Sequence, residues 1–149
     1  MKLIVQNRKA RYDYQVVEYI EAGIALLGTE VKSLREGRAN LRDSYALIRD
    51  GQVLLKGLHI SPYSHTSDRD LDPARERKLL LHKREIRRLI GKVQEKGLTL
   101  VAMKLYFNKR GVVKVDLALA KGKRSVDKRH DIADRESKRD MERAMKYRR

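Results

Sequence analysis

The chain has 149 residues, of which 36 are Lys or Arg and 20 are Asp or Glu, so its formal net charge is +16. This length predicts a single domain with a hydrophobic core, and the absence of cysteine excludes disulfides, thiolate metal sites and thiol nucleophiles. No apolar run is long enough to span a bilayer, and a pI near 10.2 predicts a polyanionic partner, nucleic acid before an anionic membrane surface.

Short strand-forming segments rich in Tyr, Val, Ile and Leu occupy much of the first sixty residues. The predicted strand pairs are residues 12–20 with 24–27 and residues 45–48 with 53–60. The first pair is separated by Glu21-Ala22-Gly23 and the second by Asp50-Gly51. Because glycine adopts the backbone conformations that tight turns need, both pairs are predicted to be hairpins.

Two helices are predicted, one short and one long. Thr29 can cap a short helix over residues 30–36, and Gly37 follows as its stop. Residues 83–96 fit an amphipathic helix that ends at Gly97. Its apolar stripe consists of Ile86, Leu89, Ile90 and Val93.

The clearest strand covers residues 112–120, where apolar and polar residues alternate, so one face is predicted to be core. Residues 99–107 are its predicted partner, joined through the loop 108–111. Lys114 then lies on the non-core face of one strand and Lys104 on that of the other. Several cations on one such face form the electrostatic track that RNA binding requires.

These elements predict a mainly β protein: a small antiparallel closed barrel of oligonucleotide-binding type, with one main helix and one short helix. An open α+β sandwich is the alternative. Residues 1–120 are predicted to form this domain. Residues 121–149 hold 12 basic and six acidic residues but few apolar ones, which predicts a basic tail that is disordered when free and helical on a polyanion.

Signals for catalysis are missing from the sequence. The four histidines are too dispersed for a metal pair, and Gly122-Lys123-Arg124-Ser125 lacks the other residues of a phosphate-binding loop. We therefore predict no enzyme, no metal and no cofactor. Two alternatives to an RNA-binding adaptor stay open: a nucleic-acid-processing enzyme on the same barrel, and a structural ribosomal protein.

Basic residues also surround an unusual apolar run, Leu79-Leu80-Leu81. The cations around it are Arg75, Arg77, Lys78, Lys83, Arg84, Arg87 and Arg88. A strand or helix can bury only part of three consecutive leucines, so at least one of them is predicted to face outward. Packing of the run in the core is the alternative.

Several strings of residues resemble one known family in their order and spacing. They are Asn7-Arg8-Lys9-Ala10, Tyr19-Ile20-Glu21-Ala22-Gly23-Ile24, Gly28-Thr29-Glu30-Val31-Lys32-Ser33-Leu34-Arg35, Asp43-Ser44-Tyr45, Arg77-Lys78-Leu79-Leu80-Leu81-His82-Lys83 and Ala120-Lys121-Gly122-Lys123. The chain resembles the SsrA-binding proteins (small protein B), the bacterial partners of transfer-messenger RNA, from about Asn7 into the tail.

The resemblance implies a function without bond chemistry. Members of the family grip the tRNA-like domain of transfer-messenger RNA and bring it to ribosomes stalled on broken messages, in the process called trans-translation. The implied partners are this RNA, the decoding centre of the small ribosomal subunit and, indirectly, elongation factor Tu with GTP and alanyl-tRNA synthetase. We expect a cytoplasmic monomer without a membrane partner, because residues 1–10 also lack the apolar stretch of a signal peptide.

The resemblance also implies which residues contact RNA. In the body they are Asn7, Arg8, Lys9, Glu21, Lys32, Lys78, Leu80 and Lys114. Leu80 would be an apolar platform for an unstacked base and Lys114 a phosphate contact, while Glu21 would accept hydrogen bonds from a base or a ribose hydroxyl.

In the tail, the residues implied to meet the ribosome are Lys121, Gly122, Lys123, Arg124, Asp127, Lys128 and Arg129. The family's tail folds as a helix in the decoding centre and the vacant message channel. Val126 departs from the family pattern, because that position often carries a ring that stacks on decoding bases. Ala102 replaces a proline expected in the penultimate strand, a change that favours regular strand pairing.

Overall fold

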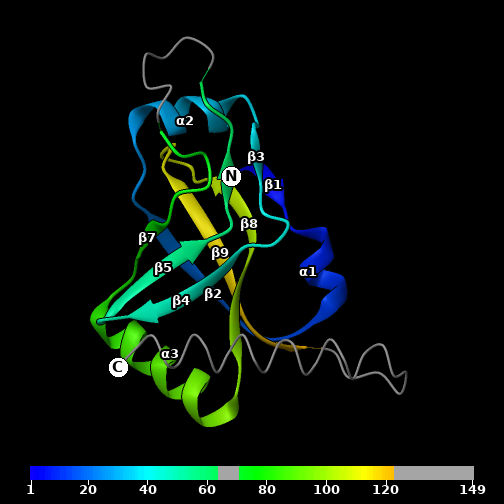
Figure 1. Cartoon of the computed structure of the whole chain (residues 1–149), viewed down its shortest axis with the longest axis vertical. Coiled ribbons are helices and arrows are strands. Elements are labelled where there is room, and N and C mark those ends of the chain that lie inside the picture. Colours follow the sequence, from blue (N-terminus) through cyan, green and yellow to red (C-terminus); the bar gives the residue numbers. More distant parts are fainter. Residues whose placement is uncertain (64–70, 123–149) are drawn as a thin grey trace.

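The computed structural model describes residues 1–63 and 71–122, and strands are the main secondary structure of this part of the chain (Figure 1). The strands are β1 (Lys2–Gln6), β2 (Tyr14–Ile24), β3 (Ala39–Asn40), β4 (Tyr45–Arg49), β5 (Gln52–Lys56), β6 (His59–Ile60), β7 (Arg77–Leu80), β8 (Thr99–Phe107) and β9 (Val113–Gly122). The helices of the described residues are α1 (Arg8–Asp13), α2 (Gly28–Arg35) and α3 (Lys83–Lys96).

Seven strands form one antiparallel sheet in the order β1-β8-β4-β5-β7-β2-β9, and β9 also pairs with β8. The last pairing closes the sheet into a ring, while β1 lies next to β4 along one edge of β8. This ring of antiparallel strands confirms the prediction of a small, closed, mainly β fold. The predicted domain boundary after Ala120 falls inside β9, which continues to Gly122.

The inner faces of the ring bury the main hydrophobic core, and α3 packs against it as predicted. Leu89 and Val93 of α3 are buried, and Ile86 and Ile90 pack against the core from the same stripe. Burial of each such side chain stabilises the fold by about 1.5–3 kcal/mol. Gly97 ends the helix in the left-handed conformation, with φ of 63°.

The turn at Asp50-Gly51 is confirmed, but the predicted hairpin over residues 12–27 is wrong. Asp50 and Gly51 both have positive φ, as a two-residue hairpin turn requires. In contrast, β2 runs without a turn through Gly23. The segment before it forms α1, whose first turn is capped by the side chain of Asn7, which accepts a hydrogen bond from the Ala10 N–H at 3.0 Å.

The predicted short helix is present as α2, but its cap differs from the prediction. The helix begins at Gly28 after Leu27, and the Glu30 carboxylate accepts the Leu27 N–H at 2.8 Å. Thr29 does not cap it, and its hydroxyl has no hydrogen-bond partner in the described residues. Gly37 follows the helix with φ of 71°, as expected for a residue that stops a helix.

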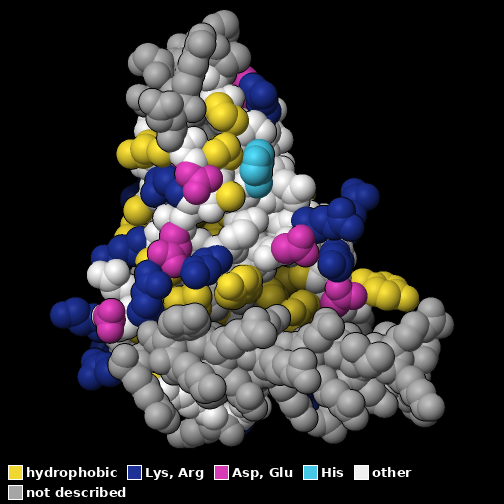
Figure 2. Space-filling view, viewed as in Figure 1, with side chains coloured by type: hydrophobic (Ala, Val, Ile, Leu, Met, Phe, Trp, Pro, Cys, Tyr) yellow, Lys and Arg dark blue, Asp and Glu magenta, His cyan; other side chains and the backbone are white. Residues whose placement is uncertain are grey.

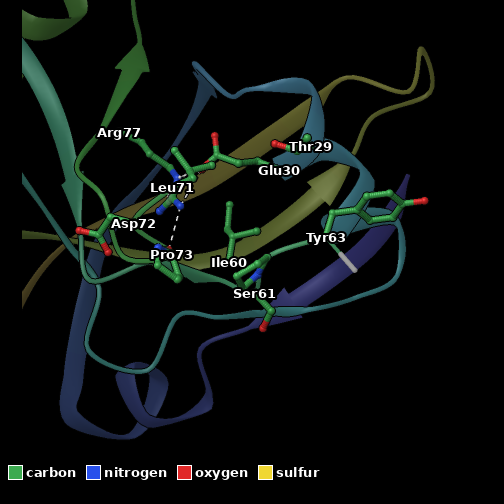
Figure 3. A pocket seen from close by; sticks show the side chains of 10 residues that line it. Thr29, Glu30, Ile60, Ser61, Tyr63, Leu71, Asp72, Pro73 and Arg77 are labelled. Atoms are coloured by element: carbon green, nitrogen blue, oxygen red, sulfur yellow. Dashed lines mark hydrogen bonds and ion pairs between the residues drawn. The ribbon is translucent and has the colours of Figure 1, made fainter. Parts of the chain in front are cut away.

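A buried ion cluster ties α2 to β7 (Figure 3). Arg77 is almost completely buried and donates from Nε to Glu30 Oε2 at 2.8 Å, while Arg75 donates from Nη2 to Glu30 Oε1 at 2.5 Å. Arg77 also donates to the carbonyl groups of Leu58 at 2.6 Å and Pro73 at 2.9 Å. These bonds hold Leu58, Pro73 and the start of β7 against α2.

The charges of this cluster shift each other's ionisation. Burial alone would raise the pKa of the Glu30 carboxyl, but hydrogen bonds from Arg75, the Leu27 N–H and Arg77 outweigh it and hold the pKa below its ordinary 4.5. Burial lowers the pKa of the Arg77 guanidinium, and Glu30 opposes this shift. Because the folded-state pKa of Glu30 is depressed, its contribution to stability is present above about pH 4.5 and is lost as the pH falls through the folded value.

We expect Glu30→Gln to destabilise the fold by about 3 kcal/mol at pH 7, because it leaves the buried Arg77 cation unpaired. Urea unfolding at about pH 7 and pH 3.5 measures this, and the difference between wild type and variant should shrink at the lower pH. Asp43→Asn is the matched control, because its ion pair with Lys9, at 3.5 Å, is exposed. Equal urea midpoints for Glu30→Gln and wild type at pH 7 would contradict the prediction.

Candidate nucleic-acid interface

Side chains from four strands meet on the outer face of the ring. Side chains alternate along a strand, so the strand positions that do not face the core face outward. Gly23 of β2 pairs in register with Leu80 of β7 on one side and with Lys114 of β9 on the other, and Lys114 pairs with Tyr106 of β8. Together with Glu21 these residues form what we call the outer site. The structure thus brings together Glu21, Leu80 and Lys114, which lie far apart in the sequence.

Leu80 is the apolar part of the outer site. Its side chain is 51% exposed, whereas that of Leu79 is buried, so the prediction that one leucine of the run faces outward is confirmed. The Leu80 side chain lies directly over Gly23: a Cβ on Gly23 would be only 3.2 Å from the Leu80 Cβ and 3.5 Å from its Cδ1. Gly23 therefore belongs to the site as the residue that leaves room for Leu80.

Glu21 is the acidic part of the site, and Tyr106 holds it. The Tyr106 hydroxyl donates a short hydrogen bond to Glu21 Oε2, across the intervening strand β9. Burial and the neighbouring carboxylate of Glu21 raise the pKa of the Tyr106 phenol, so that it keeps its proton and remains a donor. Tyr106 carries no motif in the sequence, and only the register of three strands reveals its contact.

The outer site mixes charges of both signs. Lys114 is half-buried beside Tyr106, and Lys104 lies 4.0 Å from the Asp116 carboxylate on the neighbouring strand. Burial raises the pKa of the Asp116 carboxyl, and Glu21 adds to this shift while Lys104 opposes it. Lys78 is exposed on β7 on the same side as Leu80. The site therefore offers cations for phosphates, a carboxylate for N–H or O–H donors, and an apolar surface for a base.

The other predicted contacts at the N-terminus lie at the opposite end of β2. Arg8 and Lys9 are exposed on α1, which leads directly into Tyr14, and Tyr14 pairs with Gly122 at the end of β9. Gly23 pairs with Lys114 near the start of β9. At about 3.3 Å per residue, these two ends of the strand pair are roughly 30 Å apart.

Asn7 is buried, with 3% of its surface exposed. Its side-chain amide donates to the carbonyl groups of Leu41 at 2.9 Å and Ala102 at 3.1 Å, and its side-chain oxygen caps α1. These bonds join three separate segments of the chain. The predicted RNA contact of Asn7 stays a prediction, and the structure gives the residue a positioning role in any case.

The remaining predicted residues are spread over other elements. Lys32 is exposed on α2, with its ammonium group 5.5 Å from the ring centre of Tyr63. Lys121 and Gly122 pair with Gln15 and Tyr14 at the end of β9. The other tail residues lie outside the described residues: Lys123, Arg124, Asp127, Lys128 and Arg129.

A shallow hollow beside α2 is lined by Thr29, Glu30, Ile60, Tyr63 and Arg77, among others (Figure 3). Of the three charged residues that line it, Glu30 and Arg77 already neutralise each other in the buried ion pair, and the third is Asp72. Within residues 1–63 and 71–122 there is no cluster of three or more metal-ligating side chains, and no helix is long and apolar enough to cross a membrane. On the face drawn in Figure 2, basic and acidic side chains are interspersed.

A closed ring of antiparallel strands that presents an apolar platform, cations and a carboxylate on its outer face is typical of proteins that bind nucleic acid. The model of the SmpB protein family matches residues 4–147, and the chain belongs to this family. This confirms the resemblance found in the sequence.

The curated relatives and a solved structure agree with this assignment. The chain is 60% identical over 147 residues to the SsrA-binding protein of Desulforamulus reducens and 61% identical over 148 residues to that of Syntrophobacter fumaroxidans, in each case over 99% of this chain and 91% of the relative. It is also similar to a solved chain described as "tmRNA-SmpB: a journey to the center of the bacterial ribosome", with a TM-score of 0.68, 53% identity and coverage of 94% of both chains.

We expect Gly23→Ala to weaken RNA binding about fivefold, because the added Cβ pushes Leu80 out of its place over the strand. A filter-binding titration with the tRNA-like fragment of transfer-messenger RNA measures the loss. Gly91→Ala is the control, since a Cβ at Gly91 meets nothing within 4 Å. Unchanged affinity of the Gly23 variant would show that the close contact with Leu80 does not matter for binding.

Proposed function

We propose that this protein is an RNA-binding adaptor for ribosome rescue. It binds the tRNA-like domain of transfer-messenger RNA through the outer site and delivers this RNA to stalled ribosomes for trans-translation. It acts by binding alone and makes or breaks no covalent bond. The observation that carries the proposal is the convergence of Glu21, Leu80 and Lys114 on one face of a chain that belongs to the SmpB family.

Each group of the outer site has a separate task in this proposal. Lys114 contacts a phosphate, and Lys78, exposed on β7 on the same side as Leu80, adds a second cation. Leu80 supports the face of an unstacked base, as apolar platforms do in proteins that bind single strands. Glu21 accepts a hydrogen bond from a base or a ribose 2′-hydroxyl. An RNA of another shape does not place such a donor at this point. Cations attract any RNA, so the carboxylate and the platform are what select the right one.

The two ends of the β2–β9 pair support a division of labour. The outer site lies at the end where Gly23 pairs with Lys114, and β9 ends at the other end, where Gly122 pairs with Tyr14. Residues 121–149 are proposed to act as the tail that occupies the decoding centre and the vacant message channel. Its contacts with ribosomal RNA are proposed for Lys121, Gly122, Lys123, Arg124, Asp127, Lys128 and Arg129.

Arg8 and Lys9 lie at the same end as the start of the tail, and Lys32 lies on α2. They stay proposed RNA contacts, to be assigned to one RNA or the other by the tests below. The remaining partners are proposed on the same basis: elongation factor Tu with GTP and alanyl-tRNA synthetase, both acting on the bound RNA. We propose that the protein is a monomer and works in the cytoplasm, where ribosomes are.

Lys114→Gln is expected to weaken binding of the tRNA-like fragment about five- to tenfold and to lower the slope of log affinity against log salt by about one. Gel-shift titrations at several salt concentrations measure both. Lys56→Gln removes the same charge from β5, where Glu76 lies 3.5 Å from the ammonium group, and serves as the control. Equal affinity of the wild type for the fragment and for an arbitrary duplex DNA would contradict the proposed function.

A chain that ends after Gly122 is expected to bind the fragment like the full chain, because β9 is complete, but to support no peptide tagging. Tagging is measured with stalled ribosomes in a reconstituted translation system, and binding with the same gel shift. Cutting after Asp116 is the contrasting variant, since it removes more than half of β9 and should abolish folding and binding together. Normal tagging by the chain that ends after Gly122 would refute the division of labour.

A further inference from the structure

Tyr106 and Glu21 are 85 residues apart in the sequence, and their hydrogen bond spans the strand between them. Tyr106 belongs to β8, the middle strand is β9, and Glu21 belongs to β2. The Tyr106 side chain is buried at 6% exposure, while Glu21 is exposed. A buried phenol therefore holds one carboxylate oxygen of a glutamate side chain at the surface.

We propose that Tyr106 is a positioning residue that keeps Glu21 and Lys114 apart, so that both remain available to RNA. This inference rests on the proposed function of the outer site. It assigns to Tyr106 no contact with RNA of its own. Its task is to hold the Glu21 carboxylate near the Lys114 ammonium group without letting the two form an ion pair.

The need for such a residue follows from the register. Glu21 pairs with Asp116, and Lys114 is two residues along the same strand, on the same face. Diagonal neighbours of this kind lie roughly 7–8 Å apart at the backbone, which the long Glu and Lys side chains easily bridge. The like charge of Asp116 would favour such a move of Glu21 toward Lys114. In the described residues, however, Glu21 and Lys114 form no ion pair, and the Glu21 carboxylate is bonded to Tyr106 instead.

The hydrogen bond also decides which oxygen faces RNA. The phenol occupies Glu21 Oε2, and among the described residues nothing donates a hydrogen bond to Oε1. Glu21 Oε1 is thus the acceptor left for an N–H group of a base or a ribose hydroxyl. A fixed acceptor rejects an RNA that brings no donor to this point, because the carboxylate then loses its solvation without a partner.

The test compares two RNAs of equal length, the tRNA-like fragment and an arbitrary hairpin, in gel-shift titrations at one salt concentration. Tyr106→Phe removes only the hydroxyl and is expected to weaken fragment binding about tenfold and hairpin binding clearly less. The hairpin loses only the free charge of Lys114, whereas the fragment also loses the fixed acceptor of Glu21. In a Glu21→Gln background, the same change is expected to have little further effect, because the two residues act as one unit. Tyr45→Phe, on the exposed part of β4, is the matched control.

Three outcomes would overturn the inference. Equal fragment binding by wild type and Tyr106→Phe would show that the hydroxyl does not matter. Equal weakening for both RNAs, or an unchanged tenfold loss in the Glu21→Gln background, would show that Tyr106 acts through the general fold and not through Glu21. Failure of the wild type itself to prefer the fragment would overturn the proposed function, and this inference with it.

Discussion

The long antiparallel pairing of β2 with β9 is the constraint on which the rest of the structure depends. It extends from Tyr14 with Gly122 to Gly23 with Lys114 and is a necessary part of the closed ring. Because side chains alternate along each strand, the register that buries Val115 and Leu117 in the core also turns Lys114 outward. A shift by one residue would exchange the two faces, so the core and the outer site are specified together.

Elements determined by residues close together in the sequence could be predicted, and features determined by contacts between distant segments could not. The apolar stripe and the glycine stop predicted α3 at its observed bounds, and Asp50-Gly51 predicted its hairpin. Gly23 misled the prediction of a turn, because its cause lies on another strand, where Leu80 occupies the space that a Cβ would need. In a sequence, a glycine that makes room and a glycine that makes a turn look alike.

The basic run around the three leucines shows the same limit for charge. The sequence suggested one cationic cluster. In the structure, however, Arg75 and Arg77 form ion pairs with Glu30, and Arg88 forms ion pairs with Glu18 and Glu85. Glu30 lies 45 and 47 residues from its two arginines, beyond the reach of any local pattern. A net charge of +16 therefore says that the protein is attracted to a polyanion but not which cations are left to bind it.

What selects one RNA from others must come from groups that attraction alone would not favour. An exposed acid in a basic protein repels phosphates and so reduces binding to RNA in general, and an exposed leucine gains nothing from charge. Each is also maintained by a buried or small neighbour: Tyr106 donates to Glu21, and Gly23 makes room for Leu80. Neither neighbour stood out in the sequence as a binding residue. The resemblance pointed to the side chains that are proposed to face the RNA, whereas the groups that hold these side chains in place were identified only from the register of the strands.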